Sequence, residues 1–437
     1  MKVLLVGGGG REHALAWRLR QDDPSTNIIA APGNPGIAEL ATCLPIGATD
    51  IDALATAARQ HGVDWTLVGP EAPLAAGIVD RFRAEGMPIF GPTRAAAMLE
   101  TSKAFTKSLM LDAGVPTARA LTCETLYEVE RAIAEIGAPL VVKASGLAAG
   151  KGVIICETPQ EALDAATAML SENVFGDAGN TVLIEEFMEG EELSMFFVTD
   201  GEFSYALPPA QDHKRLLDGD RGPNTGGMGA YSPVALAPLD SELYETVFSR
   251  VVRPTLEAMR ARQTPFTGLL YAGLMLTHDG PKVVEFNCRF GDPETQVVLP
   301  ALQAGLPISE WMARVARGES LRADANLTWQ GAALTTVLAA SGYPDKPRTG
   351  DRIELPAIPD DVLLFHAGTK RDVTGNLVTA GGRVLAVTGL GETVEDARAK
   401  SQELADAIHF AGKQYRTDIG WREMARRSEM AKGAGAS

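Results

Sequence analysis

Polar and apolar side chains alternate between Glu285 and Arg289, as they do along a β-strand. Glu285, Asn287 and Arg289 would share one face of that strand. The opposite face would carry the apolar residues Val284, Phe286, Cys288 and Phe290. A carboxylate beside an amide oxygen suits a hard cation such as Mg²⁺, which is usually shared between one or two protein ligands and substrate phosphates. An arginine in the same row could hold a carboxylate or phosphate group, although an edge strand with a solvated polar face would show the same alternation.

The turn after this strand adds two more carboxylates beside the arginine. Asp292 and Glu294 follow in the tight sequence Gly-Asp-Pro-Glu at residues 291–294, which favours a functional site over a solvated strand. The stretch 289–294 resembles the signature of the phosphoribosylamine–glycine ligase (glycinamide ribonucleotide synthetase) family of ATP-grasp enzymes, and the resemblance covers nearly the whole chain. The implied site residues are Arg289 and Asp292 in catalysis, and Glu285 and Asn287 as ligands of Mg²⁺ or Mn²⁺.

One departure from the wider ATP-grasp superfamily concerns the metal. Many of its members carry an acidic metal ligand on the preceding strand, but residues 271–276 here read Tyr-Ala-Gly-Leu-Met-Leu. We therefore expect phosphate oxygens and water to complete the metal shell around the two protein ligands.

Two strands joined by a glycine-rich loop form a candidate phosphate-binding hairpin. Residues 140–143 and 153–156 read as the strands, and the loop between them contains Gly146, Gly150 and Gly152. The spacing differs from that of a Walker A loop, and a strand rather than a helix follows, so a plain hairpin turn is the alternative. The family resemblance implies that the loop closes over ATP, the co-substrate. The implied nucleotide-binding residues are Lys103 at a helix start, Lys143, Gly150, Lys151, Gly152, the adenine hinge Glu185, Glu186, Phe187 and Met188, and Glu192 at the ribose.

The N-terminus combines a strand at residues 3–6, four glycines at 7–10 and a helical pattern at 11–19. Such a turn binds anions because free backbone N–H groups at the helix N-terminus face the ligand. A dinucleotide fingerprint for NAD or FAD is a competing interpretation, but Glu12 stands where its third glycine should be. A purely structural turn remains possible on this pattern. We predict that Gly9 and Gly10 contact a phosphate-bearing substrate.

Further substrate contacts are predicted after the next strand and in two later loops. Glu71 follows the strand at 65–68, where it could accept hydrogen bonds from a sugar or simply favour a helix start. Segments 210–215 and 222–231 resemble those of the ligase family, and we interpret both as walls of the amino-acid and acceptor site. The Gly and Pro content of 222–231 predicts a long irregular loop, which is usually functional. The predicted substrate-binding residues there are Asp212, a candidate for the glycine ammonium, Lys214, Gly226 and Gly227.

Composition narrows the classes of partner. The formal net charge of −16 argues against nucleic acid, which is bound through clustered Lys and Arg. The four cysteines are scattered without a Cys-x-x-Cys pair, which fits a reducing compartment and no structural zinc. Apolar runs are too short for a signal peptide or a membrane span. We expect a cytoplasmic monomer or weak homodimer whose partners are glycine, 5-phosphoribosylamine and ATP.

The predicted fold class is a multidomain combination of α/β and α+β parts. The length of 437 residues suggests about three domains. We expect an open, Rossmann-like α/β substrate domain at 1–101 and an ATP-grasp core at 102–325 with its small lobe at about 120–190. A small C-terminal α+β lobe would follow at 326–427, then a loose tail at 428–437. In that lobe His366 reads as a strand residue near the cleft rather than a catalyst.

The resemblance also implies a reaction. ATP would phosphorylate the carboxylate of glycine, and the amine of 5-phosphoribosylamine would displace phosphate to give glycinamide ribonucleotide, ADP and phosphate, in de novo purine (IMP) biosynthesis. The alternatives are an ATP-grasp ligase with another carboxylate or acceptor, a nucleotide-dependent oxidoreductase and a non-catalytic nucleotide-binding regulator. Phosphoryl transfer needs mainly positioning and charge neutralisation, which the two lysines, Arg289 and a metal on Glu285 and Asn287 could supply.

Overall fold

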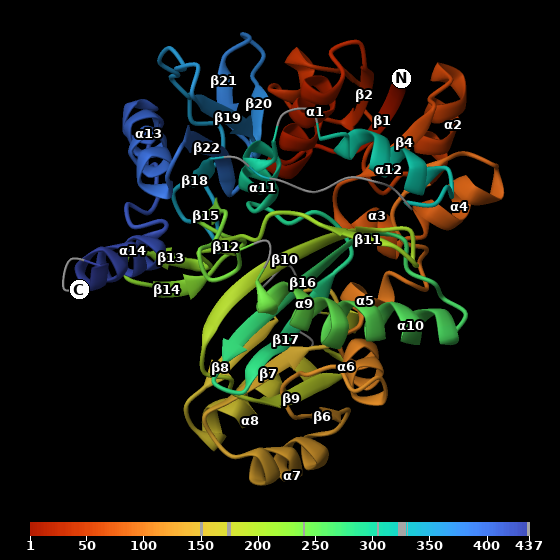
Figure 1. The fold of residues 1–437 in the computed structure, drawn as a ribbon, viewed down its shortest axis with the longest axis vertical. Helices are drawn as coiled ribbons and strands as arrows, with labels where there is room; N and C mark the ends of the chain where they lie inside the picture. The colour runs from red at the N-terminus through yellow and green to blue at the C-terminus, as the bar shows by residue number, and fades with distance from the viewer. Residues whose placement is uncertain are drawn as a thin grey trace.

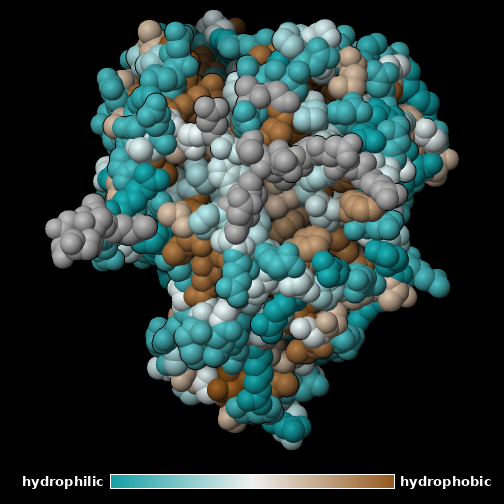
Figure 2. Space-filling view, in the orientation of Figure 1, coloured by the Kyte–Doolittle hydropathy of each residue, from teal (hydrophilic) through white to brown (hydrophobic). Residues whose placement is uncertain are grey.

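The computed structural model describes residues 1–148, 152–172, 176–238, 241–303, 306–321, 329 and 331–434. The N-terminal and C-terminal parts of the chain lie side by side at the top of Figure 1, and both adjoin the central sheet below them. A small lobe projects from the opposite end. No helix among the described residues is long and apolar enough to span a bilayer. In the space-filling view, hydrophilic residues cover most of this face of the molecule (Figure 2).

The N-terminal part is an open parallel sheet in the order β3-β2-β1-β4-β5. Its strands are β1 (Lys2–Gly7), β2 (Asn27–Pro32), β3 (Thr42–Cys43), β4 (Trp65–Val68) and β5 (Ile89–Phe90), and its helices are α1 (Gly10–Asp22), α2 (Ile51–His61), α3 (Glu71–Ala75), α4 (Ile78–Ala84) and α5 (Met98–Thr101). Side chains of β1 enter two different hydrophobic clusters, one on each face, which explains its continuous apolar run. The strand order reverses between β1 and β4, so the glycine turn and Glu71 lie at the switch point where such sheets bind ligands.

The small lobe is an antiparallel sheet in the order β6-β9-β7-β8, with its own core. Its elements are β6 (Ala120–Cys123), α7 (Leu126–Ile136), β7 (Leu140–Ala144), β8 (Val153–Cys156), α8 (Pro159–Leu170) and β9 (Val182–Glu186), preceded by α6 (Lys103–Asp112). Thr125 and Thr158 cap the two covering helices, and each accepts the N–H of a glutamate three residues later. The predicted hairpin is confirmed as an antiparallel pair with Lys143 opposite Val153. Gly150 and Lys151 lie outside the described residues.

The large lobe contains the sheet β11-β10-β16-β17. Its elements are β10 (Glu191–Thr199), β11 (Ser204–Ala206), α9 (Glu242–Val247), α10 (Arg253–Ala261), β16 (Gly268–Thr277), β17 (Gly280–Asn287), α11 (Thr295–Ala301) and α12 (Ile308–Ala316). Strands β10, β16 and β17 are long and antiparallel, and they form the floor between the small lobe and the two upper domains (Figure 1).

A third large sheet joins two distant parts of the chain in the order β12-β15-β18-β22-β19. Its strands are β12 (Gln211–Asp212), β15 (Gly229–Ser232), β18 (Ala332–Ala339), β19 (Val362–His366) and β22 (Arg383–Gly391), covered by α13 (Val394–Ala407). Two short hairpins, β13 (Arg215–Leu217) with β14 (Arg221–Asn224) and β20 (Thr369–Arg371) with β21 (Leu377–Thr379), flank it. Strand β15 pairs with β18, so residues predicted to belong to the ATP-grasp core extend the C-terminal sheet.

Two local predictions are corrected by these elements. The segment 222–231 is not a long irregular loop, because β14 and β15 occupy most of it. The last helix, α14 (Trp421–Ala434), continues through residues expected to form a loose tail from 428. Arg426 in this helix donates to Glu191 and Glu423, which ties the C-terminal helix to β10.

Candidate active site

Strand β17 carries Glu285 and Asn287 of the predicted polar row, but it ends at Asn287, so the prediction that Arg289 lies in the strand is wrong. The pairing of β17 with β16 also has one irregularity. Gly273 of β16 lies opposite Glu285, whereas the next residue of β16 lies opposite Val283, so Val284 is an extra residue in the ladder. Val283 consequently joins the core with Phe286, while Val284 lines the same small pocket as Glu285. The prediction that Val284 lies on the apolar face is therefore wrong, because the bulge shifts the alternation at this point.

Arg289 is held by two carboxylates from the N-terminal part of the chain. Its Nη2 lies 2.9 Å from Oε1 of Glu100, and its Nε lies 3.3 Å from Oε2 of Glu71. Burial disfavours the charge of Arg289, but Glu100 and Glu71 outweigh that effect and raise its pKa. The same guanidinium donates to Oδ1 of Asn287 at 3.3 Å. The ion pairs therefore join Arg289 to the N-terminal domain.

Asp292 lies where the three parts of the chain meet. Its Oδ1 accepts from Nε2 of Gln296 at 2.8 Å, and its Oδ2 is 3.3 Å from Nη2 of Arg383 on β22. A Cβ built on Gly9 would lie 3.7 Å from Oδ2, so the carboxylate is next to the glycine turn. Burial alone would raise the pKa of Asp292, but Arg383 and Arg11 lower it overall. An ionised carboxylate at this turn is available to orient a cationic or amine group.

The carboxylate of Glu12 lies inside the glycine turn and binds its backbone. Its Oε2 accepts the N–H of Gly9 at 2.5 Å, and its Oε1 accepts from Nε of Arg11 at 2.7 Å. In a dinucleotide fold this edge of the turn faces the pyrophosphate, so a carboxylate there disfavours NAD or FAD. A Cβ on Gly10 would lie 2.6 Å from Nε2 of Gln296, so the absence of a side chain lets α1 approach α11.

The two predicted phosphate-binding lysines are both positioned by the small lobe. Lys143 lies 2.7 Å from Oε2 of Glu185 and donates to the carbonyl of Val284 at 3.3 Å. Lys103 donates to the carbonyl of Gly146 at 3.3 Å, just before the glycine-rich loop. Burial is the main cause that lowers the pKa of Lys103, and Lys143 adds to it. The lysines of the hairpin and of α6 thus face the same end of β17.

The predicted adenine hinge and loop residues have varied surroundings. Glu185 is buried, and its carboxylate bonds to lysines. Glu186 accepts the N–H of Arg119 at 3.0 Å, and Phe187 and Met188 follow it, with Phe187 exposed. A Cβ on Gly152 would lie 2.6 Å from the Cβ of Ala148, so a side chain there would obstruct the base of the loop.

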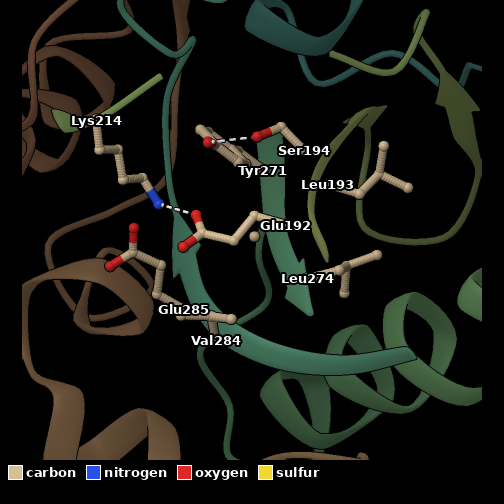
Figure 3. Close-up of a pocket in the computed structure, with 9 residues that line it drawn as sticks. Glu192, Leu193, Ser194, Lys214, Tyr271, Leu274, Val284 and Glu285 are labelled. Atoms are coloured by element: carbon tan, nitrogen blue, oxygen red, sulfur yellow. Dashed lines mark hydrogen bonds and ion pairs between the residues drawn. The ribbon is translucent and has the colours of Figure 1, made fainter. Parts of the chain in front are cut away.

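A small pocket next to β17 is lined by the predicted ribose residue Glu192, the predicted substrate residue Lys214 and the predicted metal ligand Glu285. Figure 3 shows the ammonium group of Lys214 between the carboxylates of Glu192 and Glu285, with an ion pair to Glu192. Burial opposes the charge of Lys214, yet Glu192, Asp212 and Glu285 together raise its pKa well above its usual range. For Asp212, burial is the main cause that raises the pKa, to about 7. The nearby Lys214 lowers this pKa, whereas Glu294 and Glu192 raise it further.

Glu285 can serve as a hard-cation ligand in this setting. Burial would raise its pKa, but Lys214, Lys103 and Lys143 lower it, so the carboxylate is ionised at neutral pH. Among the described residues, no group of three or more His, Cys, Asp or Glu gathers into a metal site. A cation on Glu285 and Asn287 therefore needs phosphate oxygens or water as its other ligands, which is how Mg²⁺ is commonly bound. The donor set fits that ion.

The glycines at 226 and 227 pack on the turn that contains Asp292. The N–H of Gly226 donates to the hydroxyl of Tyr343 at 2.9 Å. Gly227 has φ +108°, and a Cβ there would lie 2.5 Å from Cδ of Pro293, so only glycine fits. This wall therefore touches the Asp292 turn directly.

Charged residues that sequence reasoning missed complete the site. Arg11 donates to the carbonyl of Phe290 at 3.0 Å, and Glu100 accepts the N–H of Cys288 at 2.7 Å. Lys107 is 3.0 Å from Glu185, and Arg383 reaches Asp292. Only Lys107 had a usable signal, because it follows Lys103 by four residues and shares its helix face.

Three family models match the chain in order. They are the phosphoribosylglycinamide synthetase N domain over residues 1–100, the ATP-grasp (A) domain over 101–295 and the C domain over 333–422. Curated relatives named phosphoribosylamine–glycine ligase include those of Xylella fastidiosa (strain Temecula1) and Escherichia coli O157:H7. The first is 48% identical over 431 residues and the second 48% over 435, each alignment covering 98% of this chain and 99% of the relative. The chain belongs to the phosphoribosylglycinamide synthetase family. The predicted resemblance is thereby confirmed.

Solved structures agree with the family and with the predicted fold class. The phosphoribosylamine–glycine ligase of Thermotoga maritima superposes with a TM-score of 0.84 at 36% identity, covering 96% of this chain and 100% of that one. A biotin carboxylase from Campylobacter jejuni superposes with a TM-score of 0.73 at 17% identity, covering 96% and 93%. At that identity the second match speaks for the shared fold alone. The multidomain α/β architecture with an ATP-grasp core is confirmed.

Proposed function

We infer that this chain joins glycine to 5-phosphoribosylamine in an ATP-dependent reaction of purine biosynthesis, the activity for which its relatives are named. The observation that carries the assignment to this site is the placement of Arg289. It follows the end of β17 by two residues, donates to Oδ1 of Asn287, and forms ion pairs with Glu71 and Glu100 of the N-terminal domain. The guanidinium of Arg289, held in place by these ion pairs, is thus available between the proposed metal ligands, Glu285 and Asn287, and the glycine turn.

The nucleotide side of the site is assigned to the small lobe and the hinge. Lys103, Lys143 and the loop ending at Gly152 would hold the phosphates of ATP, and the loop residues Gly150 and Lys151 stay part of this prediction. Backbone groups near Glu186, Phe187 and Met188 would meet the adenine. Glu185 acts here by holding Lys143, because both of its oxygens are engaged by lysines. Glu192 would release its ion pair with Lys214 and accept hydrogen bonds from the ribose hydroxyls.

The metal is assigned to Glu285 and Asn287. We propose Mg²⁺ or Mn²⁺, since both take oxygen ligands. Bound there, the cation would neutralise charge on the phosphates, as in other phosphoryl-transfer enzymes. The chain's own contribution is an ionised carboxylate and an amide oxygen, with Arg289 fixing the orientation of that amide.

The transfer steps are assigned to the arginine and the turn beside it. A carboxylate oxygen of glycine attacks the γ-phosphorus of ATP, and ADP leaves. Arg289 meets the charge that moves onto the glycyl phosphate. The amine of phosphoribosylamine then attacks the acyl carbon and phosphate leaves, with Asp292 beside the amine. Asp212 would bind the glycine ammonium, Lys214 and the loop at 226–227 would line the glycine site, and Gly9, Gly10 and Glu71 would contact the acceptor.

Coupled-enzyme assays test the proposal against its rivals. ADP release should require both glycine and phosphoribosylamine, and replacing either substrate should abolish it. A change in absorbance at 340 nm on adding a nicotinamide cofactor would indicate an oxidoreductase instead. ATP binding without ADP release in the presence of both substrates would indicate a regulator.

The described cysteines are all free thiols, which supports a reducing compartment such as the cytoplasm. Light scattering would distinguish the proposed monomer from a weak homodimer.

A further inference from the structure

The guanidinium of Arg383 reaches from the first residue of β22 into the turn that contains Asp292. Its Nη1 donates to the backbone carbonyl of Asp292 at 2.7 Å, and its Nη2 lies 3.3 Å from the Oδ2 of the same residue. Nη1 also donates to the carbonyl of Gly226. One side chain of the C-terminal domain thereby holds both the backbone and the carboxylate of Asp292, together with the facing loop.

Tyr343 grips the same loop from the other side. Its hydroxyl accepts the N–H of Gly226 at 2.9 Å, so both backbone groups of this glycine are bonded to the C-terminal domain. A Cβ on Gly382 would lie 2.3 Å from Cδ2 of Tyr343, so the ring packs directly on the backbone before Arg383. Because Gly227 in turn packs on Pro293, the loop and the Asp292 turn are fixed as one unit.

This unit faces the glycine turn rather than the nucleotide. Oδ2 of Asp292 lies beside Gly9, and Gln296, which donates to Oδ1, packs against Gly10. The contacts of Lys103 and Lys143 are instead with Gly146, Glu185 and Val284. A change at Arg383 should therefore disturb the acceptor side of the site and spare the ATP side.

We propose that Arg383 is a positioning residue of the ligation step, which aims the Asp292 carboxylate and the 226–227 loop at the attacking amine. The inference rests on the proposed function and adds that the C-terminal domain takes part in acceptor binding. Arg383 contacts Asp292 and Gly226, and it acts through them.

Steady-state kinetics of Arg383→Met and Arg383→Lys test the proposal. Loss of a charge-assisted hydrogen-bond network should lower kcat/KM for phosphoribosylamine by about 10- to 100-fold, with KM for ATP changed less than about twofold. Lysine restores the charge without the planar fork and should recover only part of the loss. Arg352→Met is the matched control, because Arg352 is an exposed arginine of the same domain. A change in KM for ATP equal to that for phosphoribosylamine would overturn the proposal.

A double-mutant cycle with Asp292→Asn identifies the route of action. If Arg383 acts through Asp292, Arg383→Met should cause little further loss of kcat/KM for phosphoribosylamine in the Asp292→Asn background. Fully multiplicative losses would overturn the proposal. Tyr343→Phe keeps the ring and loosens only the loop, so it should give a smaller fall in kcat/KM for phosphoribosylamine, and it tests the proposal if Arg383→Met fails to fold. An unchanged kcat/KM for phosphoribosylamine in that variant would count against the mechanism. A wild-type chain without glycine-dependent ADP release would instead refute the proposed function.

Discussion

The ammonium group of Lys143 lies 2.7 Å from Oε2 of Glu185, and both side chains are buried. The other oxygen of this carboxylate lies 3.0 Å from Nζ of Lys107, so one anion holds two cations. Burial would raise the pKa of Glu185, but the two lysines lower it. The arrangement leaves a net positive charge at the strand end where the nucleotide phosphates are proposed to bind.

Glu185→Gln should therefore damage both stability and ATP binding. Removing one partner of a buried ion pair typically costs about 3–5 kcal/mol, because the other charge is left without compensation. We expect a lower Tm and a raised KM for ATP, measured by calorimetry and kinetics. Glu130→Gln, on the exposed surface of α7, is the control. A normal KM with a normal Tm would show that the lysines need no shared anion.

Glu285→Ala should remove a metal ligand while leaving the apolar face of β17 in place. Turnover should fall steeply even at saturating Mg²⁺, and the midpoint of the divalent-cation titration should move to higher concentration. Asp279→Ala, in the exposed turn before β17, serves as the control. If turnover stayed within about twofold of the parent, Glu285 would not be a ligand, since loss of a charged ligand should weaken cation binding much more.

Arg289→Met should lower kcat by about 10²–10³, the usual cost of losing one contact to transition-state charge. Arg289→Lys should recover part of the rate because it keeps the charge but loses the fork. The structure adds a stability effect, since Arg289→Met leaves Glu100 buried without its partner. Adding Glu100→Gln should restore the Tm but not kcat. If the double variant recovered both the Tm and kcat, Arg289 would have only a structural role.

Glycine binding should strengthen as pH rises through about 7. Burial raises the pKa of Asp212 to about 7, so its carboxyl group is partly protonated at neutral pH. The ionised form is the one that attracts the glycine ammonium, so KM for glycine should fall between pH 6 and pH 8. Asp212→Asn should have a high KM without this pH dependence. If KM for glycine still fell with rising pH in Asp212→Asn, a group other than Asp212 would be responsible for the pH dependence.

Folding stability should decrease below pH 6.5 because buried histidines join the N-terminal and C-terminal domains. The N–H of His366 donates to Nδ1 of His13 at 2.8 Å. Burial lowers the pKa of His13 from 6.5 to about 3, assisted by His366, and lowers that of His366 to about 4, assisted by Arg371. The unfolded chain therefore binds protons that the folded chain does not between those values and 6.5. Stability is complete above that window and is lost as pH falls through it, by about 2 kcal/mol per histidine at pH 5.

Thermal unfolding at pH 5 and pH 7 measures this effect. His13→Asn keeps an acceptor for the N–H of His366 but cannot be protonated, so its Tm should fall less between the two pH values than that of the parent. His278→Asn is the matched control, because His278 is exposed. Parallel decreases in the parent and in His13→Asn would place the acid sensitivity elsewhere.

The sequence predicted those features that depend on neighbouring residues. The strand at β17, the helix after the glycine turn and the hairpin of Lys143 all follow from local periodicity and turn residues. The bulge at Val284 did not, because it depends on how β17 aligns with β16. Local patterns report which residues alternate, whereas the register of two strands is decided by packing across both.

Residues brought in from distant parts of the chain were the main omission. Glu100 reaches Cys288 across 188 positions, and Arg383 reaches Asp292 across 91. A single charged residue in an ordinary helix or strand has the same local pattern whether it ends in solvent or in a site. The irregular loop predicted at 222–231 failed for a related reason: β15 is a strand because β18 pairs with it, despite its poor strand composition.

The pairing of β15 with β18 also affects the order of events during synthesis. One backbone edge of β15 pairs with β18, whose first residue, Ala332, is synthesised about 100 residues later. At elongation rates of about 5–20 residues per second, that delay is roughly 5–20 seconds. During that interval a nascent chain exposes an unpaired strand edge next to its substrate loops. It also lacks Arg383, so an unfinished polypeptide can present the nucleotide lobe without a working acceptor site. Ribosome-bound chains stalled before residue 332 should therefore bind ATP without consuming it.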